Sequence, residues 1–285
     1  MKKSLIVEFT KMEGAGNDFI VIDNRFFRFG DDELADLARN LCTRRTGIGA
    51  DGLLALHPAE AADADFRMIY RNADGSVGTM CGNGARCIAA FARTAGIDKA
   101  EMTFETEAGS YRTEVADDLT SVRLWMPPPF PALSADQTVV EIDGSVVKVH
   151  RIWAGTHHAV TFVGDLDGTD VVRTGSRLRR HAEFAPSGVN VNFVEDACRD
   201  EGDGMSVRAR TYEKGVEAET LACGTGAIAI AIAAVGSGRV GGDTLHVDMP
   251  GGRLTVGIEH DGRAVRSLYL EGPVRQVFRG TFDLE

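Results

Sequence analysis

One short pattern occurs twice in the chain and constrains its fold more than any other feature. Residues 80–87 read MCGNGARC and residues 222–229 read ACGTGAIA, so that Cys81 and Cys223 stand 142 residues apart. In each copy two glycines permit a tight turn, and the alanines that follow favour a helix. A single copy would fit an ordinary structural turn, but two copies in matched settings indicate a duplicated unit.

The segments that precede the two motifs also match each other. The strand-like runs VEFTKM and FIVID flank a glycine turn at Asn17, and VVKVHRIWAG and AVTFVGD flank a turn at His158, 141 residues later. A helix-like stretch, further strands, the cysteine motif and its helix follow in both halves. The run Pro127–Pro129 breaks any element and is the best candidate linker. We therefore predict an α+β fold of two similar, pseudo-symmetric domains that face each other.

Each motif cysteine falls at or just before a predicted helix N-terminus. The first backbone N–H groups of a helix have no intrahelical partner, and the helix dipole is positive there. This position lowers the pKa of a thiol and allows a carboxylate to bind the N–H groups. A substrate α-carboxylate held between two such helices would place one sulfur on each face of its α-carbon. One thiolate could then remove the α-proton while the other thiol protonates the opposite face, which predicts a racemase or epimerase.

Composition excludes several other classes of protein. A net charge of −11 and a pI near 5.2 argue against nucleic-acid binding. No apolar run approaches the roughly 18–20 residues that cross a bilayer, and the N-terminus does not resemble a signal peptide, so we expect a cytoplasmic protein without a membrane partner. The five cysteines match no zinc spacing, and Cys42, Cys87 and Cys198 read as packing residues. No lysine stands in a Schiff-base context and no phosphate-binding loop of the G-x-x-x-x-G-K type occurs, so we expect no cofactor and no metal.

The chain closely resembles the diaminopimelate epimerase family. The matching motifs are GAGNDF (14–19), GIGADG (47–52), NADGS with MCGNGARC (72–87), GVNVNF (188–193), YEKG…ETLACGTGA (212–227) and PGGRL (250–254). The resemblance implies a cofactor-independent isomerase that interconverts LL- and meso-diaminopimelate, a small-molecule substrate, in lysine and peptidoglycan biosynthesis.

The resemblance also implies the fold. Each domain would be a mixed β-sheet wrapped around a central helix, with the active site in the cleft between the domains. The first domain would span 1–126, with the last strand, about 274–285, packing back on it, and the second would span 127–273. A homodimer is a possible assembly.

The family's site residues carry over position by position. Cys81 and Cys223 resemble the two acid/base residues. The groups that would hold the reacting carboxylate are Gly82, Asn83, Gly84, Gly224 and Thr225. The side chains that would hold the amino groups and the distal carboxylate are Asn17, Asn72, Asn190, Glu213 and Lys214. Two residues of the turn 155–158, Thr156 and His158, are further candidates for substrate contact.

This chain departs from the family pattern at three places. Lys214 stands where the family usually has arginine, and it lacks the bidentate fork of a guanidinium. Thr156 and His157 stand where the family often has asparagine and proline. The segment 216–220 looks one residue longer than usual. These departures bear on substrate preference and leave the two cysteines untouched.

Several alternatives stay open at this stage. Asn72 also fits an ordinary turn asparagine, and His158 a turn histidine with satisfied hydrogen bonds. We expect at most one of Asn190 and Asn192 to face the cleft, and the motif favours Asn190. Rival functions are another racemase of the same fold, acting on proline or histidine, and a non-catalytic protein whose two thiols form a redox-switched disulfide. The residues do not assign either cysteine to a stereoisomer.

Overall fold

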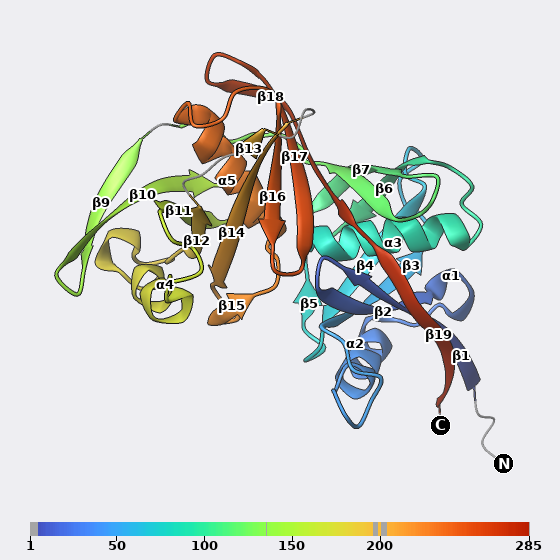
Figure 1. Cartoon of the computed structure of the whole chain (residues 1–285). Coiled ribbons are helices and arrows are strands. Elements are labelled where there is room, and N and C mark those ends of the chain that lie inside the picture. The colour runs from blue at the N-terminus through green and yellow to red at the C-terminus, as the bar shows by residue number, and fades with distance from the viewer. Residues whose placement is uncertain (1–4, 135, 196–198, 201–203, 285) are drawn as a thin grey trace. The chain divides into compact units, whose positions relative to one another are not determined.

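The computed structural model describes residues 5–134, 136–195, 199–200 and 204–284, and Cys198 lies outside them. The chain divides into two compact units (Figure 1). The first unit comprises Met1–Trp125 and Gly272–Glu285, and the second comprises Met126–Glu271. The run Pro127–Pro129 therefore follows directly on the boundary between the units.

The first unit contains three helices and nine of the described strands. Its helices are α1 (Asn24–Phe27), α2 (Asp31–Leu41) and α3 (Gly82–Thr94). Its strands are β1 (Leu5–Gly14), β2 (Asn17–Asp23), β3 (Gly52–His57), β4 (Phe66–Asn72), β5 (Val77–Gly78), β6 (Glu101–Thr106), β7 (Gly109–Val115), β8 (Ser121–Trp125) and β19 (Arg275–Leu284).

The sheet of the first unit wraps around helix α3. Its strands run in the order β19-β1-β2-β3-β4-β6-β7-β8, and the pairs β2/β3 and β4/β6 are parallel while the others are antiparallel. Helix α3 contacts β1, β2, β3, β4, β7 and β8, and nine of its residues are buried. The small side chains of Ala85, Ala89 and Ala92 allow this close approach, because they add little bulk between helix and sheet.

The second unit repeats this set of elements. Its helices are α4 (Val171–Arg179), the 3₁₀ turn η1 (Ala182–Phe184) and α5 (Gly224–Gly236). Its strands are β9 (Gln137–Ile142), β10 (Ser145–Trp153), β11 (His157–Val163), β12 (Asn190–Glu195), β13 (Arg199–Asp200), β14 (Met205–Glu213), β15 (Ala218–Thr220), β16 (Thr244–Met249), β17 (Gly252–Asp261) and β18 (Ala264–Pro273).

The second sheet has the same strand order and directions as the first. It runs β9-β10-β11-β12-β14-β16-β17-β18, with β11/β12 and β14/β16 parallel. Strand β19 of the first unit is therefore the counterpart of strand β9 in the second unit. Helix α5 contacts β10, β11, β12, β16 and β17. The prediction of an α+β fold with two similar domains, each a mixed sheet around a central helix, is confirmed.

The central helix of the second unit is apolar on all sides. It reads GTGAIAIAIAAVG, and nine of its residues are buried. A helix without a polar face is stable only inside a core, which explains why the sheet surrounds it. No helix among the described residues is both long and apolar enough to span a membrane.

Candidate active site

Each motif cysteine is the N-cap residue of a central helix, as the glycine turns predict. Cys81 precedes α3 with extended dihedral angles, φ −140° and ψ 117°, and Cys223 precedes α5 with φ −133° and ψ 110°. Their carbonyl oxygens accept the first helical hydrogen bonds, from Ala85 N at 2.8 Å and Ala227 N at 2.9 Å. Within the described residues neither cysteine side chain accepts a capping hydrogen bond from the first backbone N–H groups of its helix. The N–H groups of the first turn are thus available to an anion in both units.

The two cysteines differ in their surroundings. Cys81 is partly exposed, whereas Cys223 is only 6% exposed. The Cys223 sulfur lies 3.5 Å from Thr225 Oγ1, and the backbone N–H of Cys223 donates to Met249 Sδ at 3.4 Å. The second cysteine therefore has one contact through its sulfur and another through its backbone N–H.

The third residue after each cysteine is a glycine, and the two glycines have different steric surroundings. A Cβ at Gly226 would lie 2.5 Å from Asn192 Oδ1 and 3.1 Å from Cys223 Cβ. A Cβ at the matching position, Gly84, would lie 3.3 Å from the flexible end of Leu54. Only the second helix therefore requires glycine for close packing against a polar side chain.

This difference predicts unequal effects of two matched substitutions. Both Gly226→Ala and Gly84→Ala gain about 1 kcal/mol of helix propensity, but Gly226→Ala also displaces Asn192, at a cost of about 1–3 kcal/mol. We expect Gly226→Ala to lower the free energy of unfolding relative to Gly84→Ala by about that amount in urea titrations. Equal unfolding free energies for the two variants would contradict the close approach at Gly226.

A chain of side-chain hydrogen bonds stands beside Cys81 in the first unit. Asn83 Nδ2 donates to Asn17 Oδ1, and Asn17 Nδ2 donates to Asp51 Oδ2 at 2.9 Å. Asn17 begins β2, Asn83 lies in the first turn of α3, and Asp51 directly precedes β3. Two of the predicted site residues, Asn17 and Asn83, are therefore in direct contact.

Charged residues fix the start of β2 next to Asn17. Asp18 forms an ion pair with Lys11 at 2.7 Å and with Arg44 at 2.6 Å, and Arg44 also reaches Asp51 at 2.9 Å. Burial alone would raise the pKa of Asp18, but the hydrogen bonds from Arg44 and Lys11 outweigh it, so the pKa lies below its usual range. Asp18 is thus anionic at neutral pH and anchors both cations.

The second unit has a neutral network at the corresponding place. Asn192 Nδ2 donates to Ala159 O at 3.3 Å and contacts His158 Nδ1 at 3.1 Å, while Thr211 Oγ1 donates to Asn192 Oδ1 at 3.0 Å. Because Asn192 Nδ2 is the donor, His158 Nδ1 accepts and the imidazole proton resides on Nε2. His158 Nε2 then donates to Thr225 Oγ1 at 3.0 Å. The Thr225 hydroxyl also contacts the Cys223 sulfur at 3.5 Å, and either atom can be the donor in that contact.

Burial keeps His158 neutral. The side chain is 0% exposed, and its burial, with smaller effects of Lys214 and His157, lowers its pKa to about 3. In the unfolded chain a histidine titrates near 6.5. Between about pH 6.5 and 3 the unfolded chain therefore binds a proton that the native protein does not.

This proton linkage predicts a loss of stability in acid. The contribution of His158 is complete above about pH 6.5 and is lost as the pH falls toward 3. Between about pH 7.5 and 5, His158 should account for about 2 kcal/mol of the fall in the free energy of unfolding, and His158→Asn should lack that part of the fall. Urea unfolding at both pH values measures the free energy of unfolding, with the exposed His260→Gln as control. An unchanged pH dependence in His158→Asn would contradict a buried neutral imidazole.

Three residues predicted to hold the distal end of the substrate lie together in the second unit. Asn190 Oδ1 accepts a hydrogen bond from the backbone N–H of Lys214 at 2.8 Å. Glu213 ends β14 and accepts from Thr220 Oγ1 at 3.0 Å, and burial raises its pKa. Thr156 lies in the turn before β11, where its carbonyl accepts from Ala154 N.

Asn72 makes the contacts of a turn asparagine. Its Nδ2 donates to Ser76 Oγ at 2.9 Å, and its backbone N–H donates to Ser76 O at 2.9 Å. These bonds close the tight turn between β4 and β5. A contact between Asn72 and substrate stays a prediction.

The expectation that at most one of Asn190 and Asn192 faces the cleft stays a prediction, but the two side chains lie on one face of β12. Residues two apart on a strand point to the same face of the sheet. Both side chains are buried, and Asn192 bonds to His158 while Asn190 bonds to the backbone of Lys214.

Sequence reasoning missed several residues that position these side chains. Asp51 lies in the motif GIGADG, which was noted without a role for any residue. Arg86 lies in MCGNGARC, and its Nη2 donates to Asn83 Oδ1 at 2.7 Å. Asn192 was set aside in favour of Asn190, and Thr211 had no signal, because the contact of these two residues depends on the pairing of β12 with β14.

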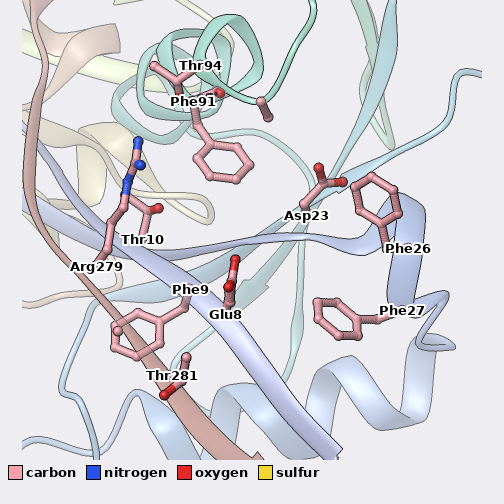
Figure 2. A pocket seen from close by; sticks show the side chains of 12 residues that line it. Glu8, Phe9, Thr10, Asp23, Phe26, Phe27, Phe91, Thr94, Arg279 and Thr281 are labelled. Atoms are coloured by element: carbon pink, nitrogen blue, oxygen red, sulfur yellow. Dashed lines mark hydrogen bonds between the residues drawn. The ribbon is translucent and has the colours of Figure 1, made fainter.

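A cavity of about 630 Å³ in the first unit lies away from these residues (Figure 2). Phenylalanine rings and a few charged side chains line it, among them Phe9, Phe26, Phe27, Phe91, Asp23 and Arg279. Phe91 and Thr94 belong to the C-terminal end of α3, whereas Cys81 caps the other end, about 20 Å away along the helix. None of the predicted site residues lines this cavity. Among the residues that the structure describes, no three His, Cys, Asp or Glu side chains form a metal-binding group.

The sequence profile of the family described as diaminopimelate epimerase matches residues 9–129 and 152–277. The diaminopimelate epimerase of Chlorobaculum tepidum is 43% identical over 276 residues, which cover 96% of this chain and 100% of that protein. That of Aquifex aeolicus is 37% identical over 286 residues, covering 98% and 99%.

Solved structures share the fold. A crystal structure of a hydroxyproline epimerase from Agrobacterium vitis, with bound trans-4-hydroxy-L-proline, gives a TM-score of 0.69 at 21% identity and covers 100% of this chain and 93% of that one. A Bacillus anthracis phenazine biosynthesis protein of the PhzF family gives 0.71 at 16% identity, covering 99% of both. At these identities the likeness concerns the fold alone.

Proposed function

The chain belongs to the diaminopimelate epimerase family, and we propose on that basis that it interconverts LL- and meso-diaminopimelate without a cofactor. The enzyme is an isomerase of lysine and peptidoglycan biosynthesis. Cys81 and Cys223 transfer protons to and from opposite faces of the substrate α-carbon.

The observation that supports this mechanism best is the repeated placement of a cysteine. Two units with the same strand order each present a cysteine as the N-cap of a buried central helix. A duplicated core explains the helices, but it does not require a thiol at the cap, where Ser, Thr, Asp or Asn are preferred. A thiol at that place in both copies is explained by acid/base chemistry.

The helix ends supply the electrostatic part of the proposed reaction. The α-carboxylate binds the backbone N–H groups at Gly82, Asn83 and Gly84 and those at Gly224 and Thr225. When one thiolate removes the α-proton, charge spreads onto the carboxylate oxygens, and the N–H donors stabilise it. The opposing thiol gives its proton to the other face, so each turnover exchanges the roles of thiol and thiolate. The proton count is then unchanged.

The remaining predicted residues bind the rest of the substrate in this proposal. Asn17, Asn72 and Thr156 contact amino or carboxylate groups, and Asn190, Glu213 and Lys214 hold the distal amino acid end. The contact of Asn190 with the backbone of Lys214 supports a shared role for the last three. His158 acts through Thr225 on the position of the Cys223 sulfur.

We further propose that the chain has two epimerase domains, 1–126 with 274–285 and 127–273, which correspond closely to the two compact units. The acidic net charge of −11 supports a protein that does not bind nucleic acid. We place the enzyme in the cytoplasm, where its thiols stay reduced. A homodimer is the assembly to test by sedimentation.

A direct assay separates this function from its rivals. Purified protein with reduced thiols should convert LL-diaminopimelate to the meso isomer in the presence of a chelator and hydroxylamine, which removes pyridoxal phosphate. Hydroxyproline, proline and histidine should be poor substrates. Preference for one of these would favour another racemase, and no turnover of any of them, together with a reversible disulfide, would favour a redox-switched thiol protein.

A further inference from the structure

Glu217 is the last residue of the turn between β14 and β15, and its carboxylate accepts hydrogen bonds from four donors. Oε1 accepts from Arg179 Nε at 3.0 Å and from the backbone N–H of Gly215 at 3.2 Å. Oε2 accepts from Arg180 Nη2 at 2.8 Å and from Tyr212 Oη at 3.4 Å. The bond from Gly215, and after it the contacts of the two arginines, hold the pKa of this carboxyl below its usual range. Glu217 is thus anionic at neutral pH and joins its own turn to the end of helix α4.

The backbone of Glu217 has a conformation that suits glycine better than glutamate. Its φ is 58°, in the left-handed region that is unfavourable for residues with a Cβ. Such a conformation persists where the surrounding structure fixes it. Here the side chain of the strained residue makes the fixing contacts itself, because its carboxylate binds both arginines of α4. The glutamate is therefore explained by its carboxylate and not by the shape of the turn.

The turn that Glu217 closes carries Lys214, which we place at the distal end of the substrate. The backbone N–H of Lys214 donates to Asn190 Oδ1 at 2.8 Å, and the next backbone N–H, that of Gly215, donates to Glu217. The backbone N–H of Glu217 in turn donates to Glu213 O at 2.8 Å. These bonds hold the chain on both sides of the Lys214 Cα, from which the ammonium extends.

Arg179 connects this turn to the strand that carries Asn190. A Cβ at Gly188 would overlap the Arg179 guanidinium and would lie 2.6 Å from Arg179 O. Gly188 stands two residues before Asn190, the first residue of β12. Arg179 thus contacts the approach to β12 on one side and the Glu217 carboxylate on the other. With the bond from Lys214 to Asn190, these contacts close a ring around the turn.

Helix α4 supports this ring by packing closely on β14. A Cβ at Gly175 in α4 would lie 2.5 Å from Tyr212 Cβ, so no side chain separates the helix from the strand at this point. Tyr212 is buried and directly precedes Glu213. The arginines at the end of α4 are therefore kept close to the turn by the packing of the helix.

The first unit holds its corresponding turn in a different way. Both turns have four residues, 73–76 between β4 and β5 and 214–217 between β14 and β15, so Ser76 corresponds to Glu217. Ser76 Oγ donates to Asp74 Oδ1 at 2.5 Å, and the backbone N–H of Ser76 donates to the same oxygen at 2.9 Å. These bonds stay within the turn. The repeated fold therefore does not require a carboxylate that reaches from this turn to the helix.

We propose that Glu217 is a positioning residue that sets the specificity of the distal site, because it fixes the backbone at Lys214 so that the ammonium binds a second substrate carboxylate. This inference deepens the proposed function and rests on it for the identity of the substrate. A lysine ammonium is a point charge on a flexible stem and lacks the rigid fork of a guanidinium. Its selectivity then depends on where the stem begins, and the Glu217 carboxylate fixes that point.

Hydrogen exchange tests the hold of Glu217 on the turn without requiring turnover. Glu217→Gly removes the carboxylate, while glycine adopts the positive φ without strain. In this variant the backbone amides of residues 213–217 should exchange at least about tenfold faster than in the wild type, because the turn opens more often. Mass spectrometry of the full-length protein after exchange in D₂O measures the rates. Unchanged rates would overturn the proposal whether or not the protein epimerises diaminopimelate.

Asp143 provides a matched control for this substitution. It also has a positive φ, 54°, and its carboxylate also binds two arginines of α4, Arg173 at 3.2 Å and Arg177. It lies in the turn between β9 and β10, however, and has no place in the ring around Lys214. Asp143→Gly should therefore leave exchange in residues 213–217 unchanged. Equal acceleration in both variants would mean that any loss of contact with α4 loosens the turn, which would refute a specific role of Glu217.

Steady-state kinetics test the specificity itself. Glu217→Gly should raise KM for diaminopimelate at least about fivefold and change kcat less than about twofold, because contacts to the distal end bind substrate and transition state alike. The kcat/KM for lysine, which lacks the distal carboxylate, should not fall. Glu217→Gln retains one acceptor oxygen and should show a smaller effect in the same direction. A loss in kcat alone, or equal losses for both substrates, would contradict the proposal.

A double variant shows whether Glu217 acts through Lys214. If it does, Glu217→Gly should raise KM no further once Lys214→Ala is present, so that the two effects are not additive. Additive effects would overturn the proposal and leave Glu217 as a stabiliser of the turn. A wild-type protein that does not epimerise diaminopimelate would refute the proposed function and the specificity inferred from it, and the exchange rates would still report whether Glu217 holds the turn.

Discussion

Cys81→Ala and Cys223→Ala should each lower the rate of epimerisation by a factor of about 10²–10⁴, the contribution that a positioned acid or base makes to proton transfer. Each variant retains one thiol, but a single thiol reaches only one face of the α-carbon. Both directions of the reaction should therefore be lost in both variants. The cysteines are helix caps without a capping bond of their own to the helix, so alanine should leave the fold intact.

A third cysteine provides the matched control for this prediction. Cys87 lies in the same helix as Cys81 and is 0% exposed. Cys87→Ala should keep its activity per folded molecule and lose about 1 kcal/mol of stability. Steady-state rates with LL- and meso-diaminopimelate, together with urea unfolding, measure both quantities. Either active-site variant that retains more than a few per cent of wild-type turnover would contradict the two-base mechanism.

Lys214→Ala should lower kcat/KM for diaminopimelate by about ten- to a hundredfold. A hydrogen bond to a charged group contributes about 1.5–3 kcal/mol, and Lys214 is proposed to supply that charge to the distal carboxylate. Its backbone is fixed by Asn190 at 2.8 Å, so truncation of the side chain should not move the loop. Lys214→Arg should be tolerated or should increase kcat/KM, because the guanidinium fork can bind a carboxylate with two hydrogen bonds.

The comparison that decides this prediction uses two substrates. Lysine has the proximal amino acid end of diaminopimelate but lacks the distal carboxylate. The loss in Lys214→Ala should be much larger for diaminopimelate than for lysine, and the exposed Lys148→Ala should affect neither. Equal losses for the two substrates, or a wild type that prefers lysine, would mean that Lys214 does not bind the distal end.

The positions of the two cysteines could be predicted because the signal is local. Two glycines and a run of alanines start a helix wherever they occur, and Cys81 and Cys223 stand directly before such runs. The duplication made the prediction stronger, since two independent turns would not match in spacing. The leucines of helix α2, which spans Asp31–Leu41, have helical spacing and are a local signal of the same kind.

The supporting contacts could not be predicted because they depend on strand pairing. Asp51 meets Asn17 only because β3 runs parallel to β2, and Thr211 meets Asn192 only because β14 pairs with β12. No short stretch of sequence contains either pair. Arg86 was overlooked for a different reason: an arginine in a helix is expected to be exposed, and only the fold shows that the sheet covers it.

In the proposed mechanism two thiols work on opposite faces of one α-carbon. The most direct test follows LL-diaminopimelate in D₂O at low conversion, with deuterium at the α-carbon measured by NMR in product and in remaining substrate. A two-base mechanism predicts meso product that carries solvent deuterium, next to remaining substrate that still carries protium, because the base that removes the proton is not the acid that delivers the new one. Product that retains the original protium, or substrate and product that exchange equally, would contradict it.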